Sequence, residues 1–87
     1  MDEIEPTPVG KFVQALRTRL RSDDRNQHCL LRGEISQWKP YASGHTYFSL
    51  RDDGGQINAV IWKGRCRIPD GIKDGHEVLI IGNGDLY

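Results

Sequence analysis

The fold of this chain is decided by residues 31–62, which read LRGEISQWKPYASGHTYFSLRDDGGQINAVIW. Apolar and polar side chains alternate over residues 31–36 and again over residues 47–51, and residues 57–62 divide into one face of Ile57, Ala59 and Ile61 and another of Asn58, Val60 and Trp62. Alternation with a period of two is typical of strands that have one buried and one exposed face. The stretch therefore predicts three consecutive β-strands.

The two segments that join these strands predict different structures, a tight turn and a longer loop. Residues 52–55 read Asp-Asp-Gly-Gly, and an Asp-Gly pair supplies the positive φ angles that a tight turn between right-twisted strands requires. We therefore expect the third strand to run antiparallel to the second. Residues 38–44 contain a proline and a glycine, so they predict a loop, and this loop would hold Trp38 and Lys39.

The segments on either side add a helix and one more strand. Thr7 and Pro8 predict an N-cap followed by a proline at the first helical position. Apolar residues recur at helical spacing from there to about Ser22, so we expect an amphipathic helix, whose basic side could face either solvent or a phosphate backbone. Residues 78–81 (VLII) form a near-continuous apolar run, which predicts a fourth strand covered on both faces.

The order of these elements indicates the fold class. Three consecutive strands, a hairpin, an irregular connection and another apolar strand follow the order of an OB fold, although other small β-barrels share it. We predict an all-β OB-fold barrel of Greek-key topology, with its fifth strand truncated, preceded by one N-terminal amphipathic α-helix. The predicted domains are a leader and N-terminal helix over residues 1–27 and an OB-fold nucleic-acid-binding domain, with strands 1 to 4, over residues 28–87.

Composition narrows the class of protein. With 37% hydrophobic and 28% charged residues the chain is typical of globular proteins. Twelve basic and twelve acidic residues cancel overall, but residues 32–67 hold six basic against three acidic residues. Cys29 and Cys66 form no CxxC pair and have no histidines at metal-ligand spacing, which favours a reducing cytoplasm. We find neither a signal sequence nor an apolar run of membrane-span length, so we expect a cytoplasmic protein that does not bind membranes.

The outward-facing side chains of the predicted strands indicate a binding face. They combine aromatic rings with basic groups, and unpaired bases stack on such rings for about 1–3 kcal/mol per base while Arg and Lys contact the phosphates. The expected partner is therefore single-stranded nucleic acid. The candidate nucleic-acid-binding residues are Arg32, Lys39, Tyr47, Ser49, Arg51, Trp62, Lys63 and Arg65.

Each aromatic candidate also has a structural interpretation. Tyr47 could serve cross-strand packing, and Trp62 could contact the N-terminal helix or the segment after its strand. Trp38 could either stack on a base or plug the end of the barrel. A further alternative is a protein-interaction barrel in which Tyr47, Val60 and Trp62 form a hot spot for another subunit. The joint placement of aromatic and basic residues favours nucleic acid.

Groups that could carry catalysis are not arranged in a known pattern. His28, His45 and His76 are scattered, without a nucleophile elbow, a helical pair of histidines or a cysteine partner. Asp52 and Asp53 are better explained by the turn than by a metal. We therefore expect no catalytic residue, no metal and no cofactor in this chain, and we expect His45 to hydrogen-bond loop backbone.

Three motifs resemble a known family. Residues 32–36 (RGEIS), 43–52 (SGHTYFSLRD) and 56–63 (QINAVIWK) resemble, at matching separations, the N-terminal OB-fold domain of the exodeoxyribonuclease VII large subunit. The resemblance covers nearly the whole chain. The further matching positions are Gly75, Val78, Gly82 and Tyr87, together with the leading helix.

The resemblance implies a function and partners. It implies an OB domain that presents single-stranded DNA to a nuclease region further along the parent chain, around which a small second subunit assembles. Trp62 and Lys63 match the family's aromatic residue followed by a basic one. A barrel that ends at Tyr87, before the family's fifth strand, leaves an open edge, so a homodimer through that edge is expected. The run Ser-Gly-His-x-Tyr-Phe disfavours the alternative of an RNA-binding, anticodon-binding-like OB domain.

Overall fold

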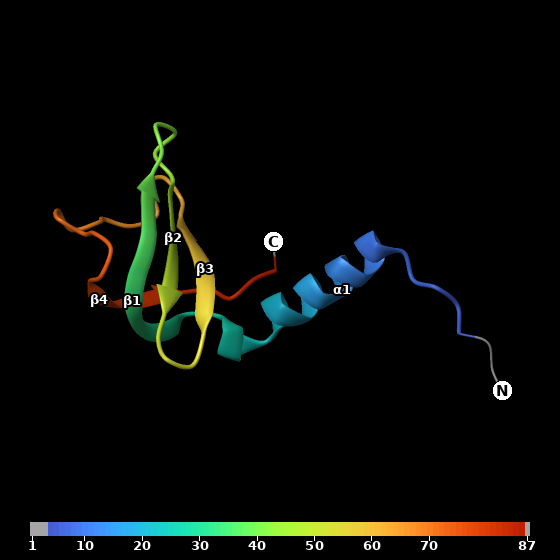
Figure 1. Ribbon diagram of the computed structural model, residues 1–87. Coiled ribbons are helices and arrows are strands. Elements are labelled where there is room, and N and C mark those ends of the chain that lie inside the picture. The colour runs from blue at the N-terminus through green and yellow to red at the C-terminus, as the bar shows by residue number, and fades with distance from the viewer. Residues whose placement is uncertain (1–3, 87) are drawn as a thin grey trace. The chain divides into compact units, whose positions relative to one another are not determined.

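The computed structural model describes residues 4–86, and Figure 1 shows their elements. The chain divides into two compact units: the described parts of residues 1–31 and 80–87 form the first, and residues 32–79 form the second. Within residues 4–86 the elements are α1 (Val9–Ser22), the 3₁₀ helix η1 (Asp24–Asn26), β1 (Cys29–Pro40), β2 (Thr46–Arg51), β3 (Gln56–Ile61) and β4 (Glu77–Gly82).

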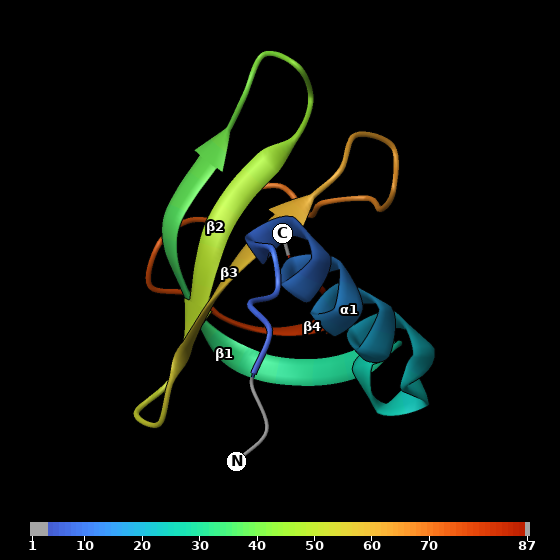
Figure 2. The same ribbon diagram turned by 90° about the vertical axis from the view of Figure 1, so that its right-hand side faces the viewer.

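The strands form one sheet in the order β3-β2-β1-β4. The pairs β1/β2 and β2/β3 are both antiparallel, which confirms the predicted hairpin. The positive φ angles expected in its turn are not present at Gly54 or Gly55, because the turn is held by Asp52 Oδ1, which accepts from both glycine N–H groups. In that hairpin the Asp52 N–H donates to the Gly55 carbonyl oxygen at 3.0 Å. Figure 2 shows that β1, β2 and β3 twist and curl strongly, as strands do when a sheet bends towards a barrel.

The core lies on one face of the sheet. Ile35, Phe48 and Leu50 are only 2–5% exposed, and they are the residues that alternation predicted to point inward. Gly33 is buried beside them, at a position with no room for a side chain. A Cβ on Gly33 would lie 2.7 Å from Leu50 Cγ. These residues, which β1 and β2 supply, fix which side of the sheet remains for binding.

The prediction that Trp38 and Lys39 lie in a loop is wrong, because both belong to β1. A β-bulge between Ser36 and Lys39 places Gln37 at a φ of 56° and lets the strand continue. Pro40, opposite Thr46, is the last residue of the strand, a position that tolerates proline, which has no N–H to donate to the ladder. The connection to β2 is therefore residues 41–45 only.

The last strand differs from its prediction too. Leu79 is 64% and Ile81 is 69% exposed, so β4 is not covered on both faces. Val78 and Ile80, which alternate with them, are half-buried, so one face of this edge strand packs against protein and the other is exposed. The homodimer expected at an open barrel edge stays a prediction.

Two smaller boundaries also change. Trp62, predicted as part of the third strand, follows the end of β3 at Ile61. Pro8, not Thr7, occupies the N-cap position of α1, in an extended conformation and without a side-chain cap. Its carbonyl oxygen accepts from the Phe12 N–H at 3.1 Å, which is the backbone role of an N-cap residue.

In the first unit, two arginines of α1 form hydrogen bonds with residues near the end of the described chain. Arg17 Nε donates to the Leu86 carbonyl oxygen at 2.9 Å, and Arg21 Nη2 donates to Asp85 Oδ2 at 2.9 Å. The Arg21 hydrogen bond holds the pKa of Asp85 below its usual value. Gly84 N–H also donates to the Asn26 carbonyl oxygen at 2.7 Å. Part of the basic side of α1 thus faces protein; Tyr87, a position of the family motif, lies outside the described residues.

Candidate nucleic-acid interface

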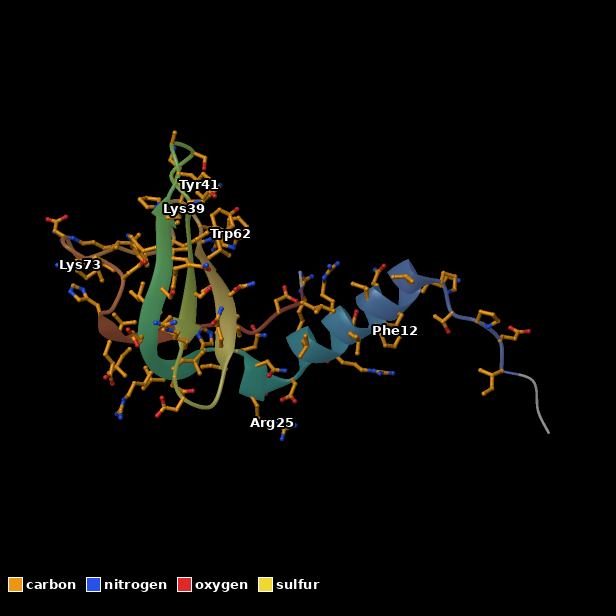
Figure 3. All side chains as sticks on the ribbon, in the orientation of Figure 1. Phe12, Arg25, Lys39, Tyr41, Trp62 and Lys73 are labelled. Atoms are coloured by element: carbon orange, nitrogen blue, oxygen red, sulfur yellow. The ribbon has the colours of Figure 1, made fainter. Side chains whose placement is uncertain are left out.

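Four rings from three segments meet at one end of the sheet, and we call them the aromatic cluster: Tyr41, His45, Tyr47 and Trp62. The Tyr41 and Tyr47 ring centroids are 5.2 Å apart, those of Tyr47 and Trp62 6.4 Å, and those of His45 and Trp62 5.1 Å. Tyr47 pairs with Val60 across β2 and β3, which brings Trp62, two residues later, beside it. Figure 3 shows Tyr41 and Trp62 near each other at this end.

The cluster is both ordered and accessible. Its three pairs have interplanar angles of 81–86°, the edge-to-face geometry that aromatic rings prefer. Tyr41 is 50%, Tyr47 42% and Trp62 39% exposed. Rings held in this way keep surface to offer to a ligand, and little side-chain freedom remains to be lost when a base stacks on them.

His45 fixes the segment that follows β3. Its Nδ1 accepts a hydrogen bond from the Lys63 backbone N–H at 2.9 Å, which confirms that His45 bonds backbone. An accepting Nδ1 means that the neutral ring carries its proton on Nε2. The Arg65 N–H donates to the Trp62 carbonyl oxygen at 3.1 Å, closing a tight turn. Trp62 and Lys63 are thus held against the β1–β2 loop.

Three cationic side chains surround the aromatic cluster. Lys39 pairs with Tyr47 in the β1/β2 register, and Lys63 and Arg65 lie in the turn that begins at Trp62. All three are exposed, and none forms an ion pair within residues 4–86. Figure 3 shows Lys39 close to Tyr41 and Trp62. The cluster therefore has positive charge around it that no carboxylate neutralises.

Gly44 shapes the contact between the loop and Lys63. Its φ is 95°, and a Cβ there would lie 2.8 Å from Lys63 Cδ. We expect Gly44→Ala to lower the free energy of unfolding by about 1–2 kcal/mol through backbone strain, and to weaken oligonucleotide binding by displacing Lys63. Urea denaturation and oligonucleotide titration measure the two effects.

Gly55→Ala is the matched control for this prediction. A Cβ at Gly55 meets nothing within 4 Å, so we expect a change of less than about 0.5 kcal/mol and unaltered binding. Equal effects of the two substitutions would contradict the role given to Gly44.

Two predicted site residues lie away from the aromatic cluster. Arg51 is four residues from Tyr47, roughly 13 Å along β2. It lies 3.8 Å from a Glu34 carboxylate oxygen, and Arg32 lies 3.9 Å from one of Glu77. Exposed pairs of this kind contribute little stability. The structure does not join Arg32 and Arg51 to the cluster, and their binding role stays a prediction.

Ser49 lies on the predicted outer face but is only 2% exposed. Side chains of neighbouring strands cover it: its hydroxyl lies 3.2 Å from Asn58 Oδ1 and 3.4 Å from Gln37 Oε1. This group belongs to an open groove of about 530 Å³, whose lining also includes Lys39 and Tyr47. Ser49 therefore cannot contact a phosphate directly, and the accessible polar groups are those of its neighbours.

The predicted site residues did not include four residues of this face: Gln37, Tyr41, His45 and Asn58. Tyr41 is a lone aromatic in a loop rich in small residues, and that contrast was the signal available. Gln37 gave no signal, because its position depends on the bulge. Trp38 was left between stacking and plugging the barrel; its ring lies 5.2 Å from the buried Phe48 ring, and both residues also line the groove.

Residues 4–86 hold no group of three or more His, Cys, Asp or Glu side chains that could hold a metal ion. In the same residues, no helix is long and apolar enough to cross a membrane. Cys29 and Cys66 are free thiols.

The arrangement defines a class of protein. OB folds bind oligonucleotides with the face of their second and third strands and with the loop between the first and second. Tyr47 lies on β2, Tyr41 and His45 lie in that loop, and the other members adjoin them: Lys39 near the end of β1, and Trp62, Lys63 and Arg65 directly after β3. The family model described as an OB-fold nucleic acid binding domain matches residues 7–87. The chain belongs to this family, which confirms the predicted OB fold.

The relatives are more specific. The chain is similar to the exodeoxyribonuclease 7 large subunit of Moorella thermoacetica, with 34% identity over 100% of this chain and 22% of the relative. The large subunit of Azorhizobium caulinodans is 40% identical over 91% of this chain and 15% of the relative, and that of Chlorobaculum tepidum 38% over 91% and 20%. The resemblance inferred from the motifs is confirmed. The chain spans about a fifth of the length of these relatives.

Proposed function

We propose that this chain binds single-stranded DNA on the face formed by the aromatic cluster and its cations. The observation that carries the proposal is the exposure of Tyr41, Tyr47 and Trp62 beside Lys39 and Lys63, which have no ion-pair partner among the described residues. Unpaired bases have free π-faces that stack on such rings, whereas bases in a duplex are already stacked on one another. The face therefore selects single strands.

The phosphate contacts predict a salt dependence. Lys39, Lys63 and Arg65 can each neutralise one phosphate, and for single strands the logarithm of affinity falls by about 0.7 per phosphate per tenfold rise in salt. Three contacts give a slope of about −2, which is roughly a 20-fold loss of affinity between 50 and 200 mM salt. Titration of the chain with a labelled oligothymidine at both salt concentrations measures it.

Two controls separate this proposal from the alternatives. Affinity that is the same at both salt concentrations would contradict it and favour an interface for a protein partner, whose apolar contacts survive moderate salt. A matched RNA oligomer should bind no more tightly than the DNA, because stacking and phosphate contacts do not require a 2′-hydroxyl. Clear preference for the RNA would replace DNA by RNA as the ligand.

The relatives suggest what the binding serves. They are large subunits of exodeoxyribonucleases, and this chain spans about a fifth of them. In a protein of that kind, this domain would hold the substrate strand and present it to a nuclease region outside the chain. Phosphodiester cleavage and contact with a small subunit would likewise belong to regions outside the chain.

A further inference from the structure

The β-bulge in β1 aims one amide side chain at the proposed binding face. Gln37 has a φ of 56°, a conformation that residues with a side chain rarely adopt. The bulge interrupts the ladder with β2, and the Trp38 N–H instead donates to Asp74 Oδ1 at 2.8 Å. Bulges often re-aim a side chain beside a binding site. Here the structure holds in place a backbone conformation that points Gln37 towards Ser49.

Ser49 ties Gln37 to a second amide. Its hydroxyl lies 3.2 Å from Asn58 Oδ1 and 3.4 Å from Gln37 Oε1, so β1, β2 and β3 each supply one member of the group. A hydroxyl has one proton, which Ser49 donates to the Asn58 oxygen or shares with the Gln37 oxygen, since both atoms that face it are amide oxygens. Neither amide NH₂ donates a hydrogen bond to another side chain of residues 4–86, so both NH₂ groups and the second lone pair of each oxygen remain for a ligand.

The group lies where a base would lie. Gln37 and Asn58 line the same open groove as Tyr47 and Lys39. The edge of an unpaired base carries hydrogen-bond donors and acceptors side by side. A base stacked at Tyr47, with its phosphate near Lys39, would turn that edge towards the two amides.

We propose that Gln37 and Asn58, positioned by Ser49, hydrogen-bond the edge of one base of the bound strand. The inference rests on the proposed function and deepens it. It adds a second basis for selecting single strands, because base pairing in a duplex occupies the Watson–Crick edge. All four bases offer a donor beside an acceptor, so the subsite recognises an unpaired base rather than a particular sequence.

The test compares hexathymidylate with the same oligomer in which every thymine is replaced by difluorotoluene, a mimic of equal shape that hydrogen-bonds poorly. We expect the wild-type chain to bind the thymine oligomer about fivefold more tightly, the scale of a net hydrogen bond or two. Gln37→Gly should reduce this preference to about twofold, because the Asn58 contact remains. Glycine adopts a φ of 56° without strain, so this variant keeps the bulge.

Gln56→Ala is the matched control, because Gln56 is an exposed amide two residues from Asn58 on the same face of β3 and does not line the groove. It should keep the wild-type preference, and the urea midpoints of both variants should show folded protein. If the wild-type chain binds both oligomers equally, or Gln37→Gly keeps the preference, while binding remains salt-dependent, the base contact is wrong and the proposed function stands. A chain that binds neither oligomer overturns both.

Discussion

Replacing Trp62 with alanine should weaken binding of oligothymidine about 5- to 150-fold, the equivalent of about 1–3 kcal/mol for one stacked base. The ring is 39% exposed and stands edge-to-face with His45 and Tyr47, so it offers surface to a base in a fixed orientation. Fluorescence anisotropy of a labelled oligomer at 50 mM salt measures the loss.

Two further substitutions control this result. Trp62→Phe keeps a ring and should recover most of the affinity. Phe12→Ala should change affinity little, because Phe12 is an exposed ring on α1, outside the proposed binding face. Wild-type affinity in a folded Trp62→Ala variant would remove the stacking role and favour packing as the function of this residue.

Replacing Phe48 with alanine should lower the free energy of unfolding by about 3–5 kcal/mol. Phe48 is 5% exposed, pairs with Ala59 across β2 and β3, and lies against the Trp38 ring. Domains of this size have only about 5–15 kcal/mol of stability, so the variant should be largely unfolded well below the wild-type melting temperature. Urea denaturation followed by circular dichroism measures the change.

Tyr47→Ala is the comparison for Phe48→Ala. The two residues are adjacent in β2, but Tyr47 points to the opposite face and is 42% exposed. Its loss should cost much less stability and considerably more affinity for single-stranded DNA. A larger loss of stability for Tyr47→Ala than for Phe48→Ala would contradict the assignment of Phe48 to the core face and of Tyr47 to the binding face.

The core face could be predicted because its signal is local. Side chains alternate across a strand, so the apolar positions of residues 31–36 and 47–51 identify the buried side without knowledge of the partner strands. The hairpin could also be predicted from a local pattern. Asp52 Oδ1 accepts from the Gly54 and Gly55 N–H groups at 2.8 and 3.0 Å, a turn that the Asp-Asp-Gly-Gly sequence favours.

The binding face could be predicted only in part, because it depends on the register between β2 and β3 and on the β-bulge at Gln37. Tyr47 and Trp62 meet through the pairing of Tyr47 with Val60, which alternation alone does not fix. The bulge at Gln37 moves Lys39 from a loop into β1. Ser49 was correctly given the outer face, but side chains from two other strands bury it. Contacts of this kind between strands cannot be predicted from a local sequence pattern.

An NMR titration of the uniformly ¹⁵N-labelled chain with hexathymidylate at 50 mM salt tests whether the aromatic cluster and its cations bind DNA. We expect backbone shifts to concentrate in residues 37–49 and 58–65, and the indole N–H of Trp62 to move more than that of Trp38. Shifts confined to α1, or a spectrum unchanged at saturating oligomer, would contradict it.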